Sequence, residues 1–297
     1  MYQFIFNQLI SNIPLKSYKF KFYMVLRNLV GKFFNPNISY KLGAYDIKIP
    51  ITHDLPINIK IYPEYNQNLG KIAKAIEEKY PSNSIIDVGA NIGDSVAIIH
   101  KYVKSPILCI EGNDLYLPLL RANTSSLPNV SIEDSFVGDE EVVVSTHSSL
   151  GTAFIEKSSG DGIKVKKIST ILDKHPTFKN SKLFKTDTDG FDNKILKGAK
   201  AYFNEIKPII FFEYDPYFLS KQNEIGYDIF GYLNNLGYSD LMLFENTGRY
   251  IFTINAKQER ELVELHNYFN QNGEKYMDIC AIHENDKDII QKIIKLL

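Results

Sequence analysis

Short apolar runs separated by turn residues dominate the chain from residue 84 onward. Ile85–Val88 and Ile107–Ile110 are such runs, and helical spacing of apolar residues follows each of them. Strands that alternate with helices are typical of a parallel sheet, and almost wholly apolar strands indicate a sheet that is covered on both faces. The pattern therefore predicts an α/β fold, with further strands at 130–136, 183–187, 208–213, 241–244, 250–254 and 278–282.

The strand–helix alternation breaks between residues 142 and 168. Short apolar runs at 142–145, 153–155 and 163–168 are joined by Ser- and Gly-rich loops. This composition predicts small antiparallel strands, and so a β-hairpin insertion where a crossover helix would otherwise lie. The loop Ser148–Thr152 is a candidate lid over a bound ligand.

The region before residue 81 has a different pattern. Alternating residues at 45–49 and 57–61, bracketed by Pro50 and Pro56, predict two strands. Helical spacing predicts a helix over 68–78, which Tyr80-Pro81 ends. We therefore divide the chain into an N-terminal arm and cap region, 1–80, with helical and β segments, and a main domain, 81–297.

The first strand of the main domain runs into the glycine turn Asp87-Val88-Gly89-Ala90-Asn91-Ile92-Gly93-Asp94. A strand, a glycine turn and a helix N-terminus together form a ligand cradle. The dinucleotide fingerprint needs a further glycine, and Asp87 would repel a pyrophosphate lying on the turn. The acid suits a cationic ligand such as S-adenosylmethionine. The candidate residues for this cofactor are Asp87, Gly89, Ala90, Asn91, Gly93 and Asp94.

Acidic residues follow four successive strands of the predicted sheet. Ligands of open α/β sheets bind at the carboxyl edge, where these side chains would meet. Glu111 lies 22 residues after Gly89, which fits a hydrogen bond to ribose hydroxyls of either S-adenosylmethionine or NAD. Asp187 and Asp189 are the candidates for base and substrate holder, in either order, and Glu213 for a hydroxyl contact. Weaker candidates are Asp134 and Ser135 for adenine, and Glu64, Tyr65 and Lys185 for the acceptor.

The same acids allow two other interpretations. They could cap helices or bind lysines. An acidic residue at each of four successive strand ends is, however, more than these two roles explain. Several carboxylates at one edge could also hold a divalent cation through oxygen ligands. No metal site is assigned, because the sequence does not show whether the carboxylates converge.

Composition and charge restrict the partners. The 297 residues are 44% hydrophobic and 23% charged, with a net charge of −1, as in ordinary globular proteins. The predicted core has no basic stripe, which argues against nucleic acid. Cys109 and Cys280 lie in apolar runs, which predicts two buried free thiols. The chain also has no apolar run long enough to span a membrane, and together these features predict a cytoplasmic protein.

The N-terminal arm is basic and aromatic. No acidic residue precedes Asp46, whereas six lysines and arginines lie among aromatic residues. Such a segment can lie on the inner, anionic face of a membrane, or it can pack on the core or on a second subunit of a homodimer. The sequence leaves these alternatives open.

Four motifs together resemble the FkbM-type methyltransferase family. They are DVGANIGD at 87–94, Glu111, KTDTDGFDNKILKGA at 185–199 and PIIFFE at 208–213. The resemblance covers about residues 57–282. It implies the class I methyltransferase (Rossmann-like) fold, S-adenosylmethionine as donor, and a hydroxyl acceptor on a sugar or secondary metabolite. The family commonly has Val-Glu-Gly where this chain has Thr188-Asp189-Gly190, so its acceptor can differ.

The favoured hypothesis is therefore an O-methyltransferase that acts on a sugar of a cell-surface glycan or of its precursor. Methyl transfer is an in-line displacement in which positioning of donor and acceptor contributes much of the catalysis. An NAD-binding oxidoreductase on a Rossmann-like sheet and a non-catalytic binding protein with the methyltransferase fold remain the alternatives.

Overall fold

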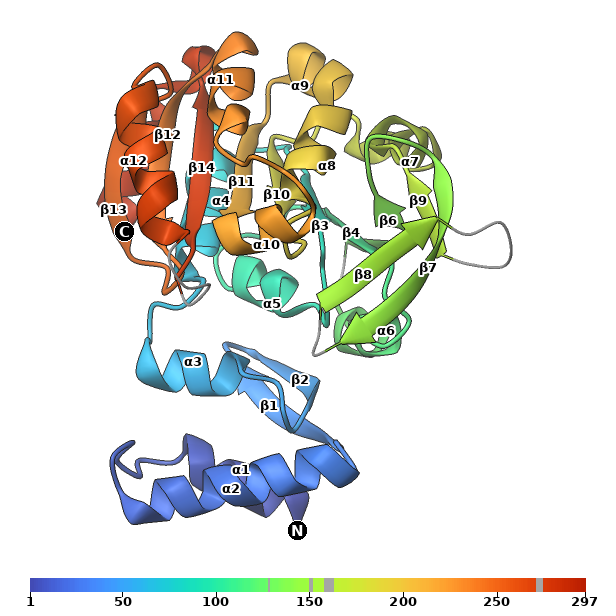
Figure 1. Cartoon of the computed structure of the whole chain (residues 1–297), viewed down its shortest axis with the longest axis vertical. Coiled ribbons are helices and arrows are strands. Elements are labelled where there is room, and N and C mark those ends of the chain that lie inside the picture. Colours follow the sequence, from blue (N-terminus) through green and yellow to red (C-terminus); the bar gives the residue numbers. More distant parts are fainter. Residues whose placement is uncertain (128, 150–151, 158–162, 271–274) are drawn as a thin grey trace.

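The structure is a computed structural model that describes residues 1–127, 129–149, 152–157, 163–270 and 275–297. Within these residues an eight-stranded sheet forms the centre of the molecule (Figure 1). Its order is β13-β12-β14-β11-β10-β3-β4-β5. The strands are β3 (Ile85–Val88), β4 (Ile107–Glu111), β5 (Val130–Asp134), β10 (Leu183–Thr186), β11 (Ile209–Tyr214), β12 (Tyr238–Glu245), β13 (Tyr250–Asn255) and β14 (Met277–His283).

The sheet is parallel from β5 to β11, and β14 then runs in the opposite direction. It lies between β11 and β12 and pairs with both in antiparallel register. Because β14 is reversed, its first residues lie at the edge where the parallel strands end. The predicted α/β architecture is confirmed, and the reversed strand brings a further segment to the ligand-binding edge.

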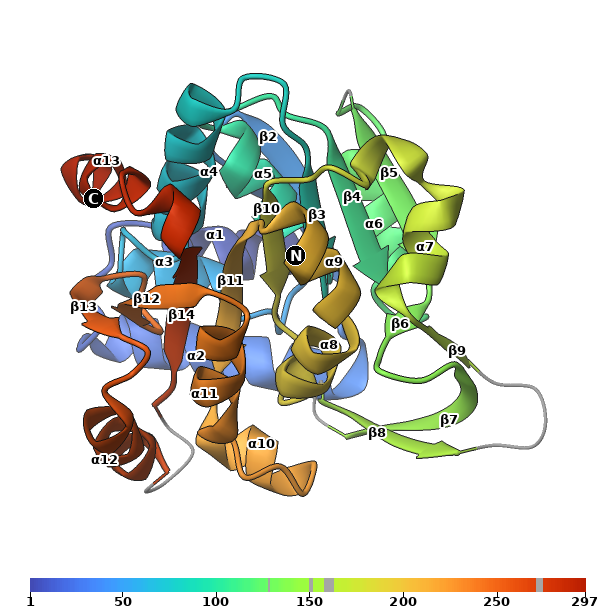
Figure 2. The same ribbon diagram turned by 90° about the horizontal axis from the view of Figure 1, so that it is seen from above.

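Helices cover both faces of the sheet, as the apolar strands predicted (Figure 2). Ile85 and Leu183 face one layer, and their neighbours Ile86 and Phe184 face the other. The first layer consists of α4 (Gln67–Lys79), α5 (Asp94–His100), α6 (Leu117–Thr124) and α13 (Ile289–Leu296). The second consists of α7 (Ile168–Lys174), α8 (Asp192–Gly198), α9 (Lys200–Ile206), α10 (Pro216–Lys221), α11 (Asp228–Asn235) and α12 (Glu259–Phe269).

The N-terminal segment forms a separate layer beyond one end of the sheet (Figure 1). Its hairpin packs on α5 and α6 through Ile47, Ile49 and Leu119. None of the helices in the described ranges has the length and apolar character needed to cross a bilayer. The elements of this layer are α1 (Tyr2–Ile10), α2 (Tyr18–Phe33), β1 (Asn37–Leu42), β2 (Tyr45–Pro50) and α3 (Leu55–Ile61).

The predicted strand at 57–61 is wrong, because this segment is helix α3. Pro56 lies in the first turn of α3, where its missing N–H costs no hydrogen bond. The Lys60 ammonium donates to the carbonyls of Leu9, Ser11 and Ile13 at 2.6–2.9 Å. These carbonyls lie at and just after the end of α1, so the contact between two helices stabilises a conformation that the alternating sequence does not favour.

The inserted strands form a four-stranded sheet of their own, in the order β6-β9-β7-β8. The hairpin of β7 and β8 is antiparallel, as predicted. The centre of the predicted lid, residues 150 and 151, lies outside the described residues. The strands are β6 (Phe136–Val137), β7 (Val142–Ser149), β8 (Thr152–Lys157) and β9 (Ile163–Lys166).

Candidate active site

The glycine turn after β3 has backbone φ angles that most residue types rarely adopt. Gly89, Asn91 and Gly93 all have positive φ, at 72°, 48° and 84°. A β-carbon on Gly89 would lie 2.0 Å from the carbonyl oxygen of Asp187, so the turn and the end of β10 are in direct contact. Glycine is required at this position both for its φ and for the close approach.

We expect Gly89→Ala to unfold at a lower denaturant concentration than the wild type. Gly43→Ala is the matched control, because Gly43 also has positive φ (61°) but has open space where a β-carbon would lie. The extra loss at Gly89 should be about 1–3 kcal/mol of unfolding free energy, the usual cost of overpacking. Urea unfolding of both variants measures it, and equal losses would mean that the contact with Asp187 is unimportant.

Glu111 ties this turn to the end of β4. Its two carboxylate oxygens accept hydrogen bonds from the backbone N–H groups of Asn91 (2.8 Å) and Asn113 (2.7 Å). Burial raises the pKa of Glu111, and the N–H groups of Asn113 and Asn91 counteract that rise. Each oxygen keeps a second lone pair, so the carboxylate can also accept a ligand hydroxyl.

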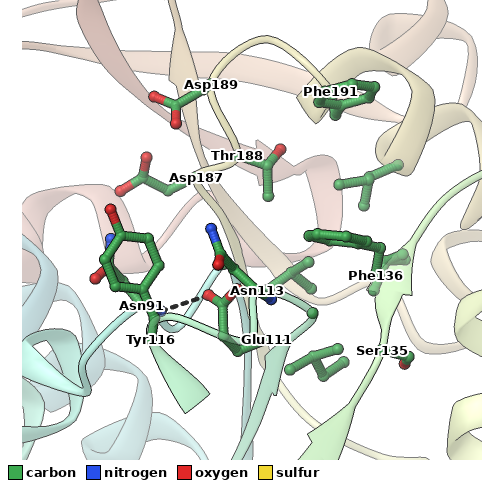
Figure 3. Close-up of a pocket in the computed structure, with 16 residues that line it drawn as sticks. Asn91, Glu111, Asn113, Tyr116, Ser135, Phe136, Asp187, Thr188, Asp189 and Phe191 are labelled. Atoms are coloured by element: carbon green, nitrogen blue, oxygen red, sulfur yellow. Dashed lines mark hydrogen bonds between the residues drawn. The ribbon is translucent and has the colours of Figure 1, made fainter. Parts of the chain in front are cut away.

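A pocket opens above these residues, and we call it the glycine-turn pocket (Figure 3). Six of the predicted site residues line it: Gly89, Asn91, Glu111, Ser135, Asp187 and Asp189. The polar side chains of Asn91, Tyr116, Asp187 and Asp189 gather on one side, opposite Phe136 and Phe191. The remaining lining residues are Val88, Ile110, Gly112, Asn113, Val137, Thr188 and Ile195.

Three buried polar atoms in this pocket have no hydrogen-bond partner in the described part of the chain. They are Oδ1 of Asn91, Oγ of Ser135 and Oγ1 of Thr188. A buried polar group without a partner costs free energy, so such atoms mark a place where a ligand completes the hydrogen bonding. Together with Glu111 and the apolar wall, they fit a nucleoside that has both a ribose and an aromatic base.

Asp87 lies beneath the pocket and does not line it. Its carboxylate is fully buried, 3.0 Å from the ammonium of Lys185 on the neighbouring strand, and it accepts a hydrogen bond from Ser95. Lys185 also donates to the carbonyl oxygen of Gly89 at 3.1 Å. The buried pair therefore holds the turn in place from below, and Lys185 is not positioned as a surface contact for the acceptor.

Asp187 and Asp189 occupy the mouth of the pocket on the loop that follows β10. Asp187 is half exposed and lies 3.6 Å from the Lys185 ammonium. Burial and the charges of Asp187 and Asp192 raise the pKa of Asp189 to about 7. A carboxyl with this pKa can accept a proton near neutral pH, which is the property that a general base requires.

A second row of acids lies beside Asp187 on the same sheet edge. Glu213 of β11 is paired in register with Asp278 of β14, and both are buried. Burial and then the charge of Asp187 raise the pKa of each well above its usual range. Asp278 was not among the predicted residues, because a residue at the start of a strand reaches this edge only if the strand is reversed.

Other predicted residues lie outside the glycine-turn pocket. Ala90 and Gly93 pack against the core of the first helix layer and against α6. Asp134 forms an exposed ion pair with Arg121 at 3.2 Å, and so it does not contact the pocket that would hold adenine. Glu64 is exposed and pairs with Lys71 at 3.0 Å.

A second cavity lies between the N-terminal layer and helices α5 and α6, and we call it the N-terminal groove. It shares Asn113 and Tyr116 with the glycine-turn pocket, so the two spaces are neighbours. Asp94 and Tyr65, two predicted site residues, line it. Its other lining residues include the amides of Asn28, Asn35, Asn37 and Asn58.

Comparison with known proteins agrees with this geometry. Residues 87–239, just over half of the chain, match the model of the methyltransferase FkbM domain. The chain belongs to the FkbM methyltransferase family. The class I methyltransferase fold expected for this family is confirmed by the sheet order with its reversed strand β14. No curated protein matches the chain.

Several solved structures are similar to this FkbM-family chain at low identity. One is the methyltransferase FkbM from Methylobacillus flagellatus KT, with 14% identity over 67% of this chain and a TM-score of 0.36. The present chain spans only 43% of that protein's length. Another is an O-methyltransferase from Bacillus cereus in complex with SAH, with 10% identity over 87% of this chain and 97% of that chain, at a TM-score of 0.39.

The chain therefore has the family motifs and the fold of the FkbM methyltransferases, with a pocket that fits a nucleoside at the glycine turn. A divalent metal remains unassigned: within the described residues there is no group of three or more His, Cys, Asp or Glu side chains arranged to hold a metal ion. The pocket residues absent from the sequence-based predictions include Gly112, Asn113, Tyr116, Phe136, Thr188 and Phe191. Their one signal in the sequence is their position next to predicted strand ends.

Proposed function

We propose that this FkbM-family protein is an O-methyltransferase that methylates a sugar hydroxyl of a cell-surface glycan or of its precursor. The observation that carries the proposal is the position of Asp189. Asp189 lines the glycine-turn pocket, and Tyr116 lines both this pocket and the N-terminal groove. Burial and the charges of Asp189 and Glu111 raise the pKa of Tyr116. The proposed base thus lies in the pocket for the donor, and Tyr116 connects that pocket with the second cavity.

The chemistry of the N-terminal groove supports a sugar as the acceptor. Asparagine side chains can donate and accept hydrogen bonds at once, which matches the paired donor and acceptor character of sugar hydroxyls. Five asparagines line the groove, together with the aromatic rings of Tyr65 and Tyr116. These amides and rings therefore match a hydroxyl-rich ligand.

The residues of the chain can be given separate roles in this reaction. When bound, S-adenosylmethionine supplies an electrophilic methyl group on a sulfonium. Glu111 would hold the ribose hydroxyls, and Ser135 and Thr188 would complete their hydrogen bonds to the donor. Asp189 would take the acceptor's hydroxyl proton on its carboxylate as the methyl group is transferred. Glu213, which lies beside Asp187 at the same sheet edge, would contact a hydroxyl of the acceptor.

Calorimetry with purified protein tests the donor. We expect S-adenosylmethionine to bind and NAD not to bind, and the reverse would identify an oxidoreductase. Incubation with the donor and a glycan fraction from the source cells should then add the mass of one CH₂ per transferred methyl. Donor binding without any methylated glycan would indicate a different acceptor or a non-catalytic protein.

A further inference from the structure

Helix α2 carries an exposed apolar stripe that the core does not use. The stripe consists of Tyr18, Phe22, Val25, Leu29 and Phe33, and we call it the outer stripe. These side chains are 50–91% exposed. At about 100° per residue they fall within a sector of roughly 80° on one side of the helix. The opposite side of α2 carries Phe20 and Arg27, which are buried.

This stripe lies on the outermost layer of the molecule. α1 and α2 lie at the far end from the helices α9 and α11, with α3 and the hairpin of β1 and β2 between them and the sheet (Figure 1). Phe34, just beyond α2, is 71% exposed and extends the apolar surface. An apolar row of this length on a helix in contact with water is a feature of interaction surfaces.

The charge around the outer stripe is of one sign. Lys19 lies on one side of the stripe, and Lys21 and Lys32 lie on the other, all exposed. Residues 1–45 carry six basic side chains and no acidic one, although the whole chain has a net charge of −1. A helix with apolar side chains flanked by lysines is complementary to an anionic bilayer, where the rings enter the headgroup region and the ammonium groups contact phosphate.

We propose that the outer stripe of α2 docks this protein on an anionic membrane surface. A second copy of the chain is a poorer occupant, because a two-fold interface would bring the lysines of one stripe against those of the other. Asn28, Gly31 and Lys32 of the same helix line the N-terminal groove. Docking would therefore hold the groove close to the headgroups. If the proposed function is right, this position suits an acceptor glycan carried on a lipid.

Vesicle flotation of the full chain tests the docking without requiring activity. We expect binding to vesicles of phosphatidylcholine with phosphatidylglycerol, weaker binding in high salt, and none to phosphatidylcholine alone. The double variant Phe22→Ser, Leu29→Ser should reduce the partition coefficient about tenfold or more. Its thermal unfolding should be unchanged, because both side chains are exposed.

A matched control removes the same kind of side chain elsewhere. Ile251 and Phe252 are exposed at 38% and 40% on strand β13, so Ile251→Ser, Phe252→Ser should leave vesicle binding unchanged. Equal binding by wild type and the α2 variant would overturn the proposal. So would a dimer, seen by light scattering, that the α2 variant dissociates. Donor binding by calorimetry should be the same in both variants, which separates failure of docking from failure of the proposed methyl transfer.

Discussion

Replacing Asp189 by asparagine should lower kcat by about 10²–10⁴-fold, the usual contribution of a general base. Asparagine keeps the size of the side chain but cannot accept the acceptor's proton. Asp189 faces the glycine-turn pocket and does not form the deep ion pair that Asp87 forms, so donor affinity should change little. A single-turnover assay together with donor calorimetry measures the two effects separately.

The pH dependence gives a second readout of the same residue. The pKa of Asp189 is about 7, and the ionised form is the base, so kcat/KM of the wild type should fall as the pH falls below about 7. The Asp189→Asn variant should not show this fall.

The unfolding free energy should change with pH in the opposite sense to the activity. The Asp189 carboxyl loses its proton at a lower pH in the unfolded chain than in the folded protein. The unfolding free energy therefore falls as the pH rises from about 4 to about 7.

Asp173→Asn is the control for these measurements, because Asp173 forms an exposed pair with Lys179. It should leave both kcat and the pH profile unchanged. If Asp189→Asn keeps wild-type turnover while Asp187→Asn loses it, the base is Asp187. If neither variant loses turnover, both residues are excluded from the proton transfer.

Replacing Lys185 by methionine should lower the unfolding free energy by about 3–5 kcal/mol, since it leaves a buried charge without its partner. The Lys185 side chain is 5% exposed and that of Asp87 is fully buried. Burial alone would lower the pKa of Lys185, but the charges of Asp87 and Asp187 raise it, so the ammonium stays charged. Urea unfolding measures the loss.

The double variant Asp87→Asn, Lys185→Met tests the cause of that loss. It removes both charges, so it should recover much of the stability that the single change loses. Lys179→Met is the matched surface control, with an expected change below about 1 kcal/mol. A single variant at Lys185 that is as stable as the surface control would show that Asp87 is not held by this pair.

The sequence predicted best those site residues that lie at the end of a strand or directly after it. Gly89, Glu111 and Asp187 each follow or end a short apolar run, and parallel strands must end at one edge. The structure brings them together for that reason. Asp278 and Tyr116 could not be predicted in this way. Asp278 depends on the reversed direction of β14, and Tyr116 precedes a helix whose packing decides where its ring lies.

The error at 57–61 has a similar origin. Ile57, Ile59 and Ile61 alternate with polar residues, which is the pattern of a half-buried strand. In the structure Ile57 packs with Leu9, and Lys60 binds the carbonyls at the end of α1. These contacts join residues about 50 positions apart, and local periodicity carries no information about them.

The place of β14 in the sheet has a consequence for the order of assembly during synthesis. β14 separates β11 from β12, yet it follows both in the chain. Until residues 277–283 have left the ribosome, the apolar strand β11 exposes an unpaired edge, and Glu213 has no neighbour in Asp278. The emerging chain is therefore exposed to aggregation at that edge, and its acidic row forms only in the final stage of folding.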